Sequence, residues 1–513
     1  MFENIIETIK TDRKAQVITA IGTIIVLVTV GAIIFAPKKQ EIASIPSYPI
    51  TLTWWKQYYD QSTYKEIIDE FKALPQNKDV EIEIIKKPNT TEYYRDLLQD
   101  ISRQTGPDIF TLHTDDLPAY QEYLTPLTNV RDENGNYIPD TKLLTDYKQN
   151  MADLVYQQTV DRGQIYAVTS YVESLQLYYN TNILNQAGIA NPATTWDDLI
   201  KQLPLLNKRD TNKLNFNQSA ISLGTGITKK NGKIDNGGDL NINRFQELLP
   251  LLIFQNGGQI YDRDTGTSLF GSEKTQAEIT TTTKDFNKDD QNSNPTNQAI
   301  KFYESFADVN NSHYSWNGNS NDSITSFVEG RLAYTINYSY LQDIIKNRNP
   351  NFKYSIAKLP QLDFENKRTY GFFYMDGINN ALKKAVDIIP LEEAYKTTEN
   401  KVAERKLQVA KDFMYFLTTR NQQQAFANKT GLASAHKDVI ADQTINGDIA
   451  TRIFAQGALY AQNYYKPDVK RAEQMWGDMI YRTQYENMSL EESISLATSE
   501  YGNIIKDRPK LRY

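Results

Sequence analysis

Residues 50–112 alternate segments typical of strands with segments typical of helices, and this order constrains the fold more than any other feature of the chain. The strand-like segments, which are rich in β-branched and aromatic side chains, are 50–55, 80–85 and 107–112. The helix-like segments, which repeat apolar side chains at helical spacing, are 64–71 and 91–102. This order predicts a parallel sheet with covering helices. Such sheets bind ligands beyond the carboxyl ends of their strands, here near Trp54, Trp55 and residues 113–116.

The later chain is mostly helical and contains polar insertions. Helical spacing is strongest in residues 392–426, 473–484 and 490–507, so sheet-and-helix units come first and helices last. Two polar segments, 132–140 and 280–297, predict exposed loops. Both place Asp or Asn at alternate positions, as calcium loops do. Neither has the glycine and the acidic residue that such a loop requires at its sixth and twelfth positions.

Residues 17–36 form an uncharged apolar run near the N-terminus. A helix of this length, at about 1.5 Å per residue, spans about 30 Å, the hydrocarbon thickness of a bilayer. We therefore predict a cytoplasmic tail over 1–16, one transmembrane anchor over 17–36 and a stalk over 37–47. The remaining chain is then a soluble domain on the extracytoplasmic side of the cell membrane. The alternative is a cleaved signal peptide, for which Pro37 provides a poor cleavage context.

The composition argues against several classes of chemistry. The chain has no cysteine, and its 3 histidines stand in no metal-binding spacing, so we expect no metal site. Neither a nucleophile elbow nor a phosphate-binding loop occurs, so we expect no catalytic residue and no cofactor. The net charge of −7 argues against a nucleic-acid partner. The 33 tyrosines offer flat contact area with a polar tip, which suits ligands such as sugars.

Three consecutive segments carry a resemblance to a known family. They read DRGQIYAV (161–168), LQLYYNTNILNQAGI (175–189) and PATTWDDLIKQL (192–203). In this order and spacing they resemble the extracellular solute-binding proteins of ABC importers, and in particular the sugar-binding family that includes maltose-binding protein. Further segments follow in family order, so that the resemblance covers nearly all of residues 48–507. Thr169 stands where the family usually has proline, and 280–297 lies outside the family pattern.

Most residues of the segment 175–199 are interpreted as scaffold. Asn180 is expected to satisfy backbone groups at the end of a strand. Gly188 is expected to stop a helix, and Thr195 to be the N-cap of the next one. Trp196 is expected to lie in the core rather than at a ligand. The segment that identifies the family is therefore placed beside the binding site and not in it.

The resemblance implies an α/β, two-lobed periplasmic-binding-protein-like fold with a hinge and an interlobe cleft, preceded by one N-terminal transmembrane helix. Lobe one is predicted to contain residues 48–170 and 363–437, and lobe two residues 171–362 and 440–513. The implied function is to capture a solute, an oligosaccharide, and to deliver it to ABC permease subunits as a monomer that is not an enzyme. The alternatives are a carbohydrate-active enzyme and an adhesion or sensor protein that uses the same cleft.

The same resemblance assigns candidate ligand-binding residues. They are Trp55, Tyr58, Asp115, Asp116, Glu173, Asn243, Arg244, Tyr340 and Trp476. Strand alternation allows either Trp54 or Trp55 to be the buried member of its pair. Asp116 stands where the family has a basic residue, and this difference argues against the ligand of the maltose-binding relatives.

Two of these candidates are expected to stack on sugar rings. Tyr340 and Trp476 take the places of stacking tryptophans in the family. If the Trp476 indole is partly solvated in a cleft, its replacement by alanine should weaken binding about ten- to a hundredfold and leave stability nearly unchanged.

Overall fold

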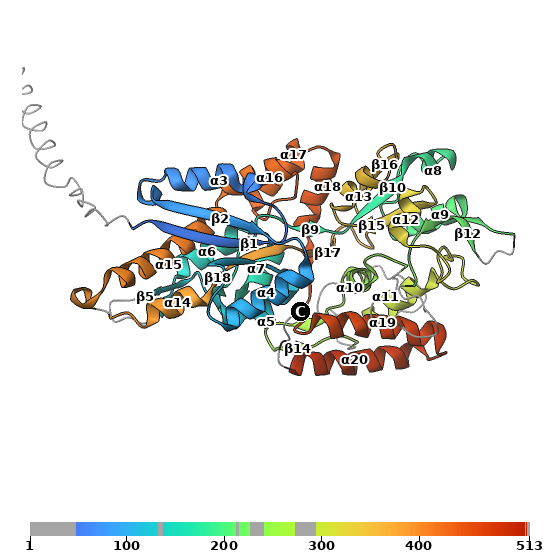
Figure 1. The fold of residues 1–513 in the computed structure, drawn as a ribbon. Coiled ribbons are helices and arrows are strands. Elements are labelled where there is room, and N and C mark those ends of the chain that lie inside the picture. Colours follow the sequence, from blue (N-terminus) through green and yellow to red (C-terminus); the bar gives the residue numbers. More distant parts are fainter. Residues whose placement is uncertain are drawn as a thin grey trace, which may run out of the picture. The chain divides into compact units, whose positions relative to one another are not determined.

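The computed structural model of the chain describes residues 48–131, 137–211, 215–225, 241–271, 294–390, 392–507 and 509. The predicted tail, anchor and stalk over 1–47 lie outside these residues, as does most of the polar segment 280–297. Within the part of the chain that is described, no helix has the length and apolar character needed to cross a bilayer. Ile50–Tyr513 form one compact unit, which contains two five-stranded sheets (Figure 1).

The first sheet has the strand order β2-β1-β3-β18-β4. Its strands are β1 (Ile50–Lys56), β2 (Val80–Lys86), β3 (Ile109–His113), β4 (Leu124–Thr125) and β18 (Tyr374–Asn379). The three strands predicted from the alternation are parallel, which confirms the expected parallel sheet. β18, from a much later part of the chain, pairs with β3 and with β4 in antiparallel fashion.

Helices pack around this first sheet, and together they form what we call lobe one. The helices are α3 (Gln61–Ala73), α4 (Thr90–Ser102), α14 (Asn380–Asp387), α15 (Thr398–Leu417) and α16 (Arg420–Thr430). Trp54 packs against Tyr64 of α3 with ring centroids 4.7 Å apart, whereas Trp55 packs against Tyr93 of α4. Neighbouring residues of a strand point to opposite faces, so helices cover both faces of the sheet.

The second sheet has the order β11-β12-β15-β10-β16. Its strands are β10 (Gln176–Asn180), β11 (Lys208–Arg209), β12 (Phe216–Ile221), β15 (Leu332–Asn337) and β16 (Tyr354–Ala357). We call this sheet and its neighbouring helices lobe two. The helices are α8 (Thr181–Gln186), α9 (Trp196–Leu206), α10 (Phe245–Gln255), α11 (Pro295–Ser305), α12 (Ser323–Val328), α13 (Leu341–Arg348), α18 (Ile449–Ala458), α19 (Val469–Tyr485) and α20 (Leu490–Lys506).

A third sheet lies at the chain crossings between the lobes, and we call it the hinge sheet. Its strands are β9 (Glu173–Ser174), β17 (Thr369–Phe372) and β19 (Ala461–Gln462), with β17 in the centre. β9 leads directly into β10 of lobe two, and β17 leads directly into β18 of lobe one (Figure 1). The chain therefore passes between the lobes at paired strands.

The remaining elements are short or peripheral. The helices are α5 (Leu117–Tyr120), α6 (Thr141–Asn150), α7 (Asp153–Thr159) and α17 (Lys437–Asn446). The 3-10 turns are η1 (Pro75–Asn77), η2 (Thr114–Asp116), η3 (Gln121–Tyr123) and η4 (Glu393–Tyr395). The paired strands are β5 (Asn129–Arg131) with β6 (Tyr137–Pro139), β7 (Val160–Asp161) with β8 (Gln164–Ile165), and β13 (Tyr261–Asp262) with β14 (Thr267–Ser268).

The predicted roles of the scaffold residues are confirmed. The Asn180 side chain accepts hydrogen bonds from the first amides of α8, and Thr195 accepts one from Asp198 at the start of α9. Gly188 has φ of 72°, in the left-handed region that glycine adopts without a steric cost. Trp196 is 2 % exposed, and its indole nitrogen donates to Gln255 at 2.6 Å. These contacts fix the conformation of the first elements of lobe two, which follow β9 of the hinge sheet in the chain.

Candidate functional site

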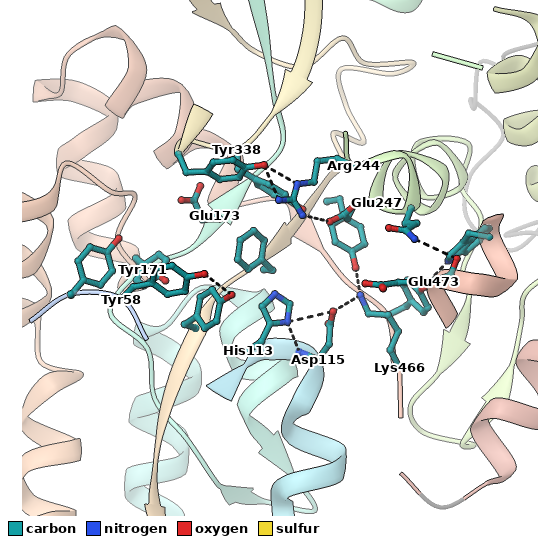
Figure 2. Close-up of a pocket in the computed structure, with 18 residues that line it drawn as sticks. Tyr58, His113, Asp115, Tyr171, Glu173, Arg244, Glu247, Tyr338, Lys466 and Glu473 are labelled. Carbon is teal, nitrogen blue, oxygen red and sulfur yellow. Dashed lines mark hydrogen bonds and ion pairs between the residues drawn. The ribbon is translucent and has the colours of Figure 1, made fainter. Parts of the chain in front are cut away.

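A cavity of about 420 Å³ lies where lobe one, lobe two and the hinge sheet meet (Figure 2). Lobe one contributes Asp115, which follows β3, and Tyr374 of β18, whereas lobe two contributes Arg244 and Glu247 at the start of α10. More than half of the lining side chains are aromatic. They are Tyr58, Tyr59, Tyr171, Tyr338, Tyr340, Tyr370, Phe372, Tyr374, Tyr464 and Trp476. The carboxyl ends of β1 and β3 face this cavity, as the strand order predicted.

The lobe-one wall is built from aromatic rings. Tyr58 is 43 % exposed, and its ring centroid lies 4.8 Å from that of Tyr374. The next residue, Tyr59, has φ of 64°. A tyrosine rarely adopts this left-handed conformation, and such residues cluster at functional sites. His113 stacks on Phe372 of the hinge sheet at 5.0 Å between centroids. The wall therefore offers flat apolar faces with polar edges.

An ion pair between Asp115 and Lys466 joins the two sides of the cavity. Lys466 Nζ lies 2.7 Å from Asp115 Oδ2, and both side chains are 8 % exposed. Lys466 also donates to the Tyr370 hydroxyl, and Asn463 Nδ2 donates to Asp115 Oδ1 at 3.2 Å. Asp115 follows β3, Tyr370 belongs to the hinge sheet, and Lys466 precedes α19 (Figure 2). The network therefore links lobe one, the hinge sheet and the segment that leads into lobe two.

A second network surrounds Arg244 on the lobe-two wall. Arg244 Nε and Nη2 donate to the Tyr340 hydroxyl at 2.9 and 2.8 Å, and Nη1 donates to Glu247 Oε1 at 3.1 Å. The Tyr340 hydroxyl in turn donates to Asn243 Oδ1 at 3.1 Å. Arg244 has φ of 72°, again in the left-handed region. These bonds hold the guanidinium in a fixed orientation at the cavity.

Glu173 of β9 places a buried carboxylate at the hinge side of the cavity. Its side chain accepts hydrogen bonds from the Ser339 amide at 3.0 Å and from the Ser339 hydroxyl at 2.6 Å. Burial raises the pKa of Glu173 to about 7, while the Ser339 bonds and the charge of Arg244 act in the opposite direction. The carboxyl group thus titrates near neutral pH.

In the native protein, ionisation of the buried Glu173 should lower the free energy of unfolding as the pH rises. We expect Glu173→Gln to abolish this decrease. A carboxyl with a higher pKa in the folded state binds more protons when folded than when unfolded. Its contribution to the free energy of unfolding therefore falls between the unfolded pKa of about 4.5 and the folded value of about 7. Between about pH 4.5 and pH 7.5, the free energy of unfolding of the variant should rise by roughly 2–3 kcal/mol relative to that of the native protein.

Urea unfolding at a series of pH values measures this difference. Besides Ser339, the neighbours that act on the Glu173 charge are Arg244 and Asp343, and both stay in place in the variant. Glu365→Gln, at an exposed loop position, is the control for the loss of one carboxylate. Parallel pH curves for the native protein and Glu173→Gln would contradict the expectation.

The structure brings six of the nine predicted site residues to one cavity. They are Tyr58, Asp115, Glu173, Arg244, Tyr340 and Trp476. Asn243 does not line the cavity. Its side chain accepts a hydrogen bond from the hydroxyl of Tyr340, which does line it. Trp55 and Asp116 do not line it either.

The placements of Trp55 and Asp116 correct the prediction. Strand alternation turns Trp55 towards α4, where the ring is 8 % exposed and Lys87 Nζ lies 3.7 Å from its centroid. Trp54 points to the opposite face and is also buried, so neither indole reaches the cavity. Asp116 is 2 % exposed and accepts a hydrogen bond from the Tyr94 hydroxyl inside lobe one.

Trp476 lines the cavity, but it is also a core residue. Its side chain is fully buried, its Nε1 donates to the Tyr464 hydroxyl at 2.8 Å, and its ring meets Phe270 edge-on at 5.0 Å. The expectation of a partly solvated indole is therefore wrong. Met475 and Met479 of the same helix are also buried.

Several lining residues were not predicted from the sequence. They are His113, Tyr171, Gln246, Glu247, Tyr338, Tyr370, Phe372, Tyr374, Tyr464, Lys466 and Glu473, together with Tyr59. Most of them lie in short loops and hinge strands, where no periodic pattern marks the direction of a side chain. Lys466 precedes a proline and a helix, which indicates a turn but no charge partner. Among the described residues, no group of three His, Cys, Asp or Glu side chains could hold a metal ion.

The fold and the position of the cavity define a two-lobed binding protein, and solved structures share this architecture. The cyclic α-maltosyl-1,6-maltose-binding protein from Arthrobacter globiformis has a TM-score of 0.62 and 17 % identity, covering 90 % of this chain and 100 % of that one. UgpB from Mycobacterium tuberculosis, solved in complex with glycerophosphocholine, has a TM-score of 0.59 and 15 % identity, covering 90 % and 99 %. Both are similar to this chain in fold.

The sequence itself assigns the family. The profile of the bacterial extracellular solute-binding proteins matches residues 66–452, and the chain belongs to that family. The family resemblance deduced from residues 161–203 is thereby confirmed. A galactooligosaccharide-binding protein from Bacillus subtilis is 24 % identical over 167 residues, which are 32 % of this chain. The match spans only 36 % of that relative's length.

Proposed function

We propose that this solute-binding protein captures an oligosaccharide in the cavity and delivers it to the permease subunits of an ABC importer. The observation that carries the proposal is the combination of an aromatic lining with charged groups held by fixed partners. Aromatic faces pack against the C–H face of a sugar ring, and carboxylates, hydroxyls and Arg bind its hydroxyl groups. Asp115, Glu173 and Arg244 are the proposed polar contacts, and Tyr58, Tyr340 and Trp476 the proposed aromatic ones.

Tyr338 supports a polar ligand at the same place. Its hydroxyl is buried and has no hydrogen-bond partner among the described residues, although the side chain lines the cavity. Leaving a buried hydroxyl without a partner costs free energy, so an adjustment of the cavity wall that brings a ligand group within reach of it is favoured. A sugar hydroxyl can both donate to and accept from the Tyr338 oxygen.

The names of two of the three relatives support this proposal, whereas UgpB was solved with glycerophosphocholine. The names of the relatives given above include a galactooligosaccharide and a cyclic maltosyl-maltose. The chain is proposed to act as a monomer that binds without turnover, with no catalytic residue, metal or cofactor. The competing function, a carbohydrate-active enzyme, requires two carboxyl groups placed on either side of a glycosidic bond.

We expect neutral oligosaccharides to stabilise the protein in thermal unfolding. A ligand that binds only the folded state at about a hundred times its dissociation constant adds about 2.7 kcal/mol, which raises the melting temperature. The panel consists of galactooligosaccharides, linear maltodextrins and cyclic maltodextrins. Chromatography of the same incubations tests for hydrolysis. A panel in which no sugar shifts the transition, or in which sugars are cleaved, would reject the proposed function.

We infer further that residues 17–36 form a retained anchor that holds the binding domain outside the cytoplasmic membrane. The uncharged apolar run and the extracellular family support this inference. N-terminal sequencing of the protein purified from membranes is expected to yield the residues before Val17. A mature N-terminus after Ala36 would instead identify a removed signal peptide.

A further inference from the structure

Glu173 differs from Asp115 and Glu247 of the same cavity, because no cationic side chain of the described residues forms an ion pair with it. Asp115 is paired with Lys466, and Glu247 with Arg244. The Glu173 carboxylate has only the two neutral donors of Ser339, and no Lys, Arg or His nitrogen of the described residues lies within 4.0 Å of it. A buried carboxylate without a cation is costly, because the interior replaces little of the hydration that the charge loses.

The surroundings of Glu173 are aromatic. Phe372 lies directly opposite Glu173 in the pairing of β17 with β9, so the two side chains share one face of the hinge sheet. Burial raises the pKa of Tyr59 and of Tyr171, and the negative charge of Glu173 adds to this effect in both. Both tyrosines also line the cavity, and Figure 2 shows Tyr171 and Glu173 on the same side of it, away from Lys466.

A carboxylate among aromatic rings is an environment that favours an ammonium group. The carboxylate supplies a charge-assisted hydrogen bond, and the faces of tyrosine and phenylalanine attract a cation through their quadrupoles. The cavity lining also carries more acidic than basic side chains, Asp115, Glu173, Glu247 and Glu473 against Arg244 and Lys466. An anionic ligand is correspondingly disfavoured there.

We propose that Glu173 is a cation subsite and that the ligand presents a protonated amino group to it, so that the preferred oligosaccharide contains an amino sugar. This inference rests on the proposed function for the sugar and adds the charge of the ligand. A neutral sugar can hydrogen-bond to Glu173, but it adds no counter-charge in direct contact with the carboxylate, and Arg244 acts on it only from beyond ion-pair distance. A protonated amine supplies both the hydrogen bond and the charge.

Pairs of ligands that differ in one functional group test the proposal. Oligosaccharides of 2-amino-2-deoxyglucose and 2-amino-2-deoxygalactose are compared by calorimetry with their hydroxyl counterparts of the same linkage and length at about pH 7. We expect at least one amino sugar to bind roughly tenfold or more tightly than its counterpart, the gain of one buried charge-assisted contact. Equal or weaker binding of all the amino sugars would overturn the proposal.

Variants identify the residue responsible. Glu173→Gln keeps the size of the side chain and a partner for Ser339, and it should lower the ratio of amino-sugar affinity to neutral-counterpart affinity at least tenfold. Glu173→Asp retains the charge and should retain the preference, which covers the case of a poorly folding Gln variant. Glu304 is another carboxyl group whose pKa is raised by burial, but it lies outside the cavity lining. Glu304→Gln should therefore change neither the amino-sugar affinity nor the neutral-sugar affinity.

The outcomes separate this inference from the proposed function. Binding of neutral sugars without an amino preference would overturn the cation subsite and leave the sugar-binding function intact. Choline is included as an ammonium ion without a sugar ring. Glu173-dependent binding of choline in the absence of any sugar binding would sustain a cation subsite and reject the proposed oligosaccharide. An amino preference that persists in Glu173→Gln would overturn the assignment to Glu173.

Discussion

Replacing Trp476 by alanine is expected to lower the free energy of unfolding by about 3–5 kcal/mol, the usual cost of removing a buried tryptophan. The indole is fully buried in the middle of α19, packs edge-on against Phe270 and donates to the Tyr464 hydroxyl. Its removal leaves a cavity and deprives the Tyr464 hydroxyl of its donor. Because the same indole lines the ligand cavity, affinity should fall as well.

Denaturant unfolding and calorimetry on the same variants separate the two effects. Trp476→Phe keeps most of the buried area and should lose much less stability than the alanine variant. Tyr58→Ala is the matched comparison at the lobe-one wall, where the ring is 43 % exposed, and it should weaken binding with little loss of stability. A loss below about 1 kcal/mol for Trp476→Ala would show that the indole does not support the core.

Replacing Lys466 by methionine is the second change with a large expected effect. Lys466 and Asp115 form an ion pair with both side chains 8 % exposed, and the lysine also donates to the Tyr370 hydroxyl. Methionine preserves the length of the side chain but leaves the Asp115 carboxylate buried with the weaker donor Asn463 and with His113 Nδ1 at 3.6 Å. Breaking a buried pair in this way costs about 3–5 kcal/mol, mainly because the remaining charge loses its cationic partner.

A double-mutant cycle with Asp115→Asn tests this explanation. If the cost arises from the isolated carboxylate, Lys466→Met combined with Asp115→Asn should be more stable than Lys466→Met alone. Small-angle scattering of the same proteins reports whether the contact also holds the lobes together. A double variant with the summed losses of the single variants would contradict a direct interaction between the two residues.

The local elements of lobe one could be predicted from the sequence because their signals repeat along the chain. The strands that begin at Ile50, Val80 and Ile109 and the helices between them follow from side-chain periodicity within each segment. The N-caps at Asn180 and Thr195 depend on their own side chains, which accept hydrogen bonds from backbone amides two or three residues further on. The family pattern in residues 161–203 is also contiguous, and it is sufficient to indicate the class of protein.

The candidate site could be predicted only in part. Asp115, Glu173 and Arg244 were found by resemblance, but their partners were not. Lys466 carries no local signal of an ion pair, and Asn463, which bonds to the same carboxylate, is 348 positions from Asp115. Whether a carboxylate is paired or left with neutral donors depends on which distant segment packs beside it. That difference separates Asp115 from Glu173 and carries the proposal of a cation subsite.

The sequence by itself therefore determined the class of fold, the family and the order of the elements, because these depend on periodic and contiguous patterns. Only the tertiary structure decided which side chains meet at the hinge. Trp54 and Trp55 are equivalent in an alternating strand, and both became core residues once helices covered both faces of the first sheet. Trp476 belongs both to the core and to the cavity, because it lies on the buried face of α19 and also lines the cavity. Burial and charge pairing arise from contacts between segments far apart in the chain, and no local pattern encodes them.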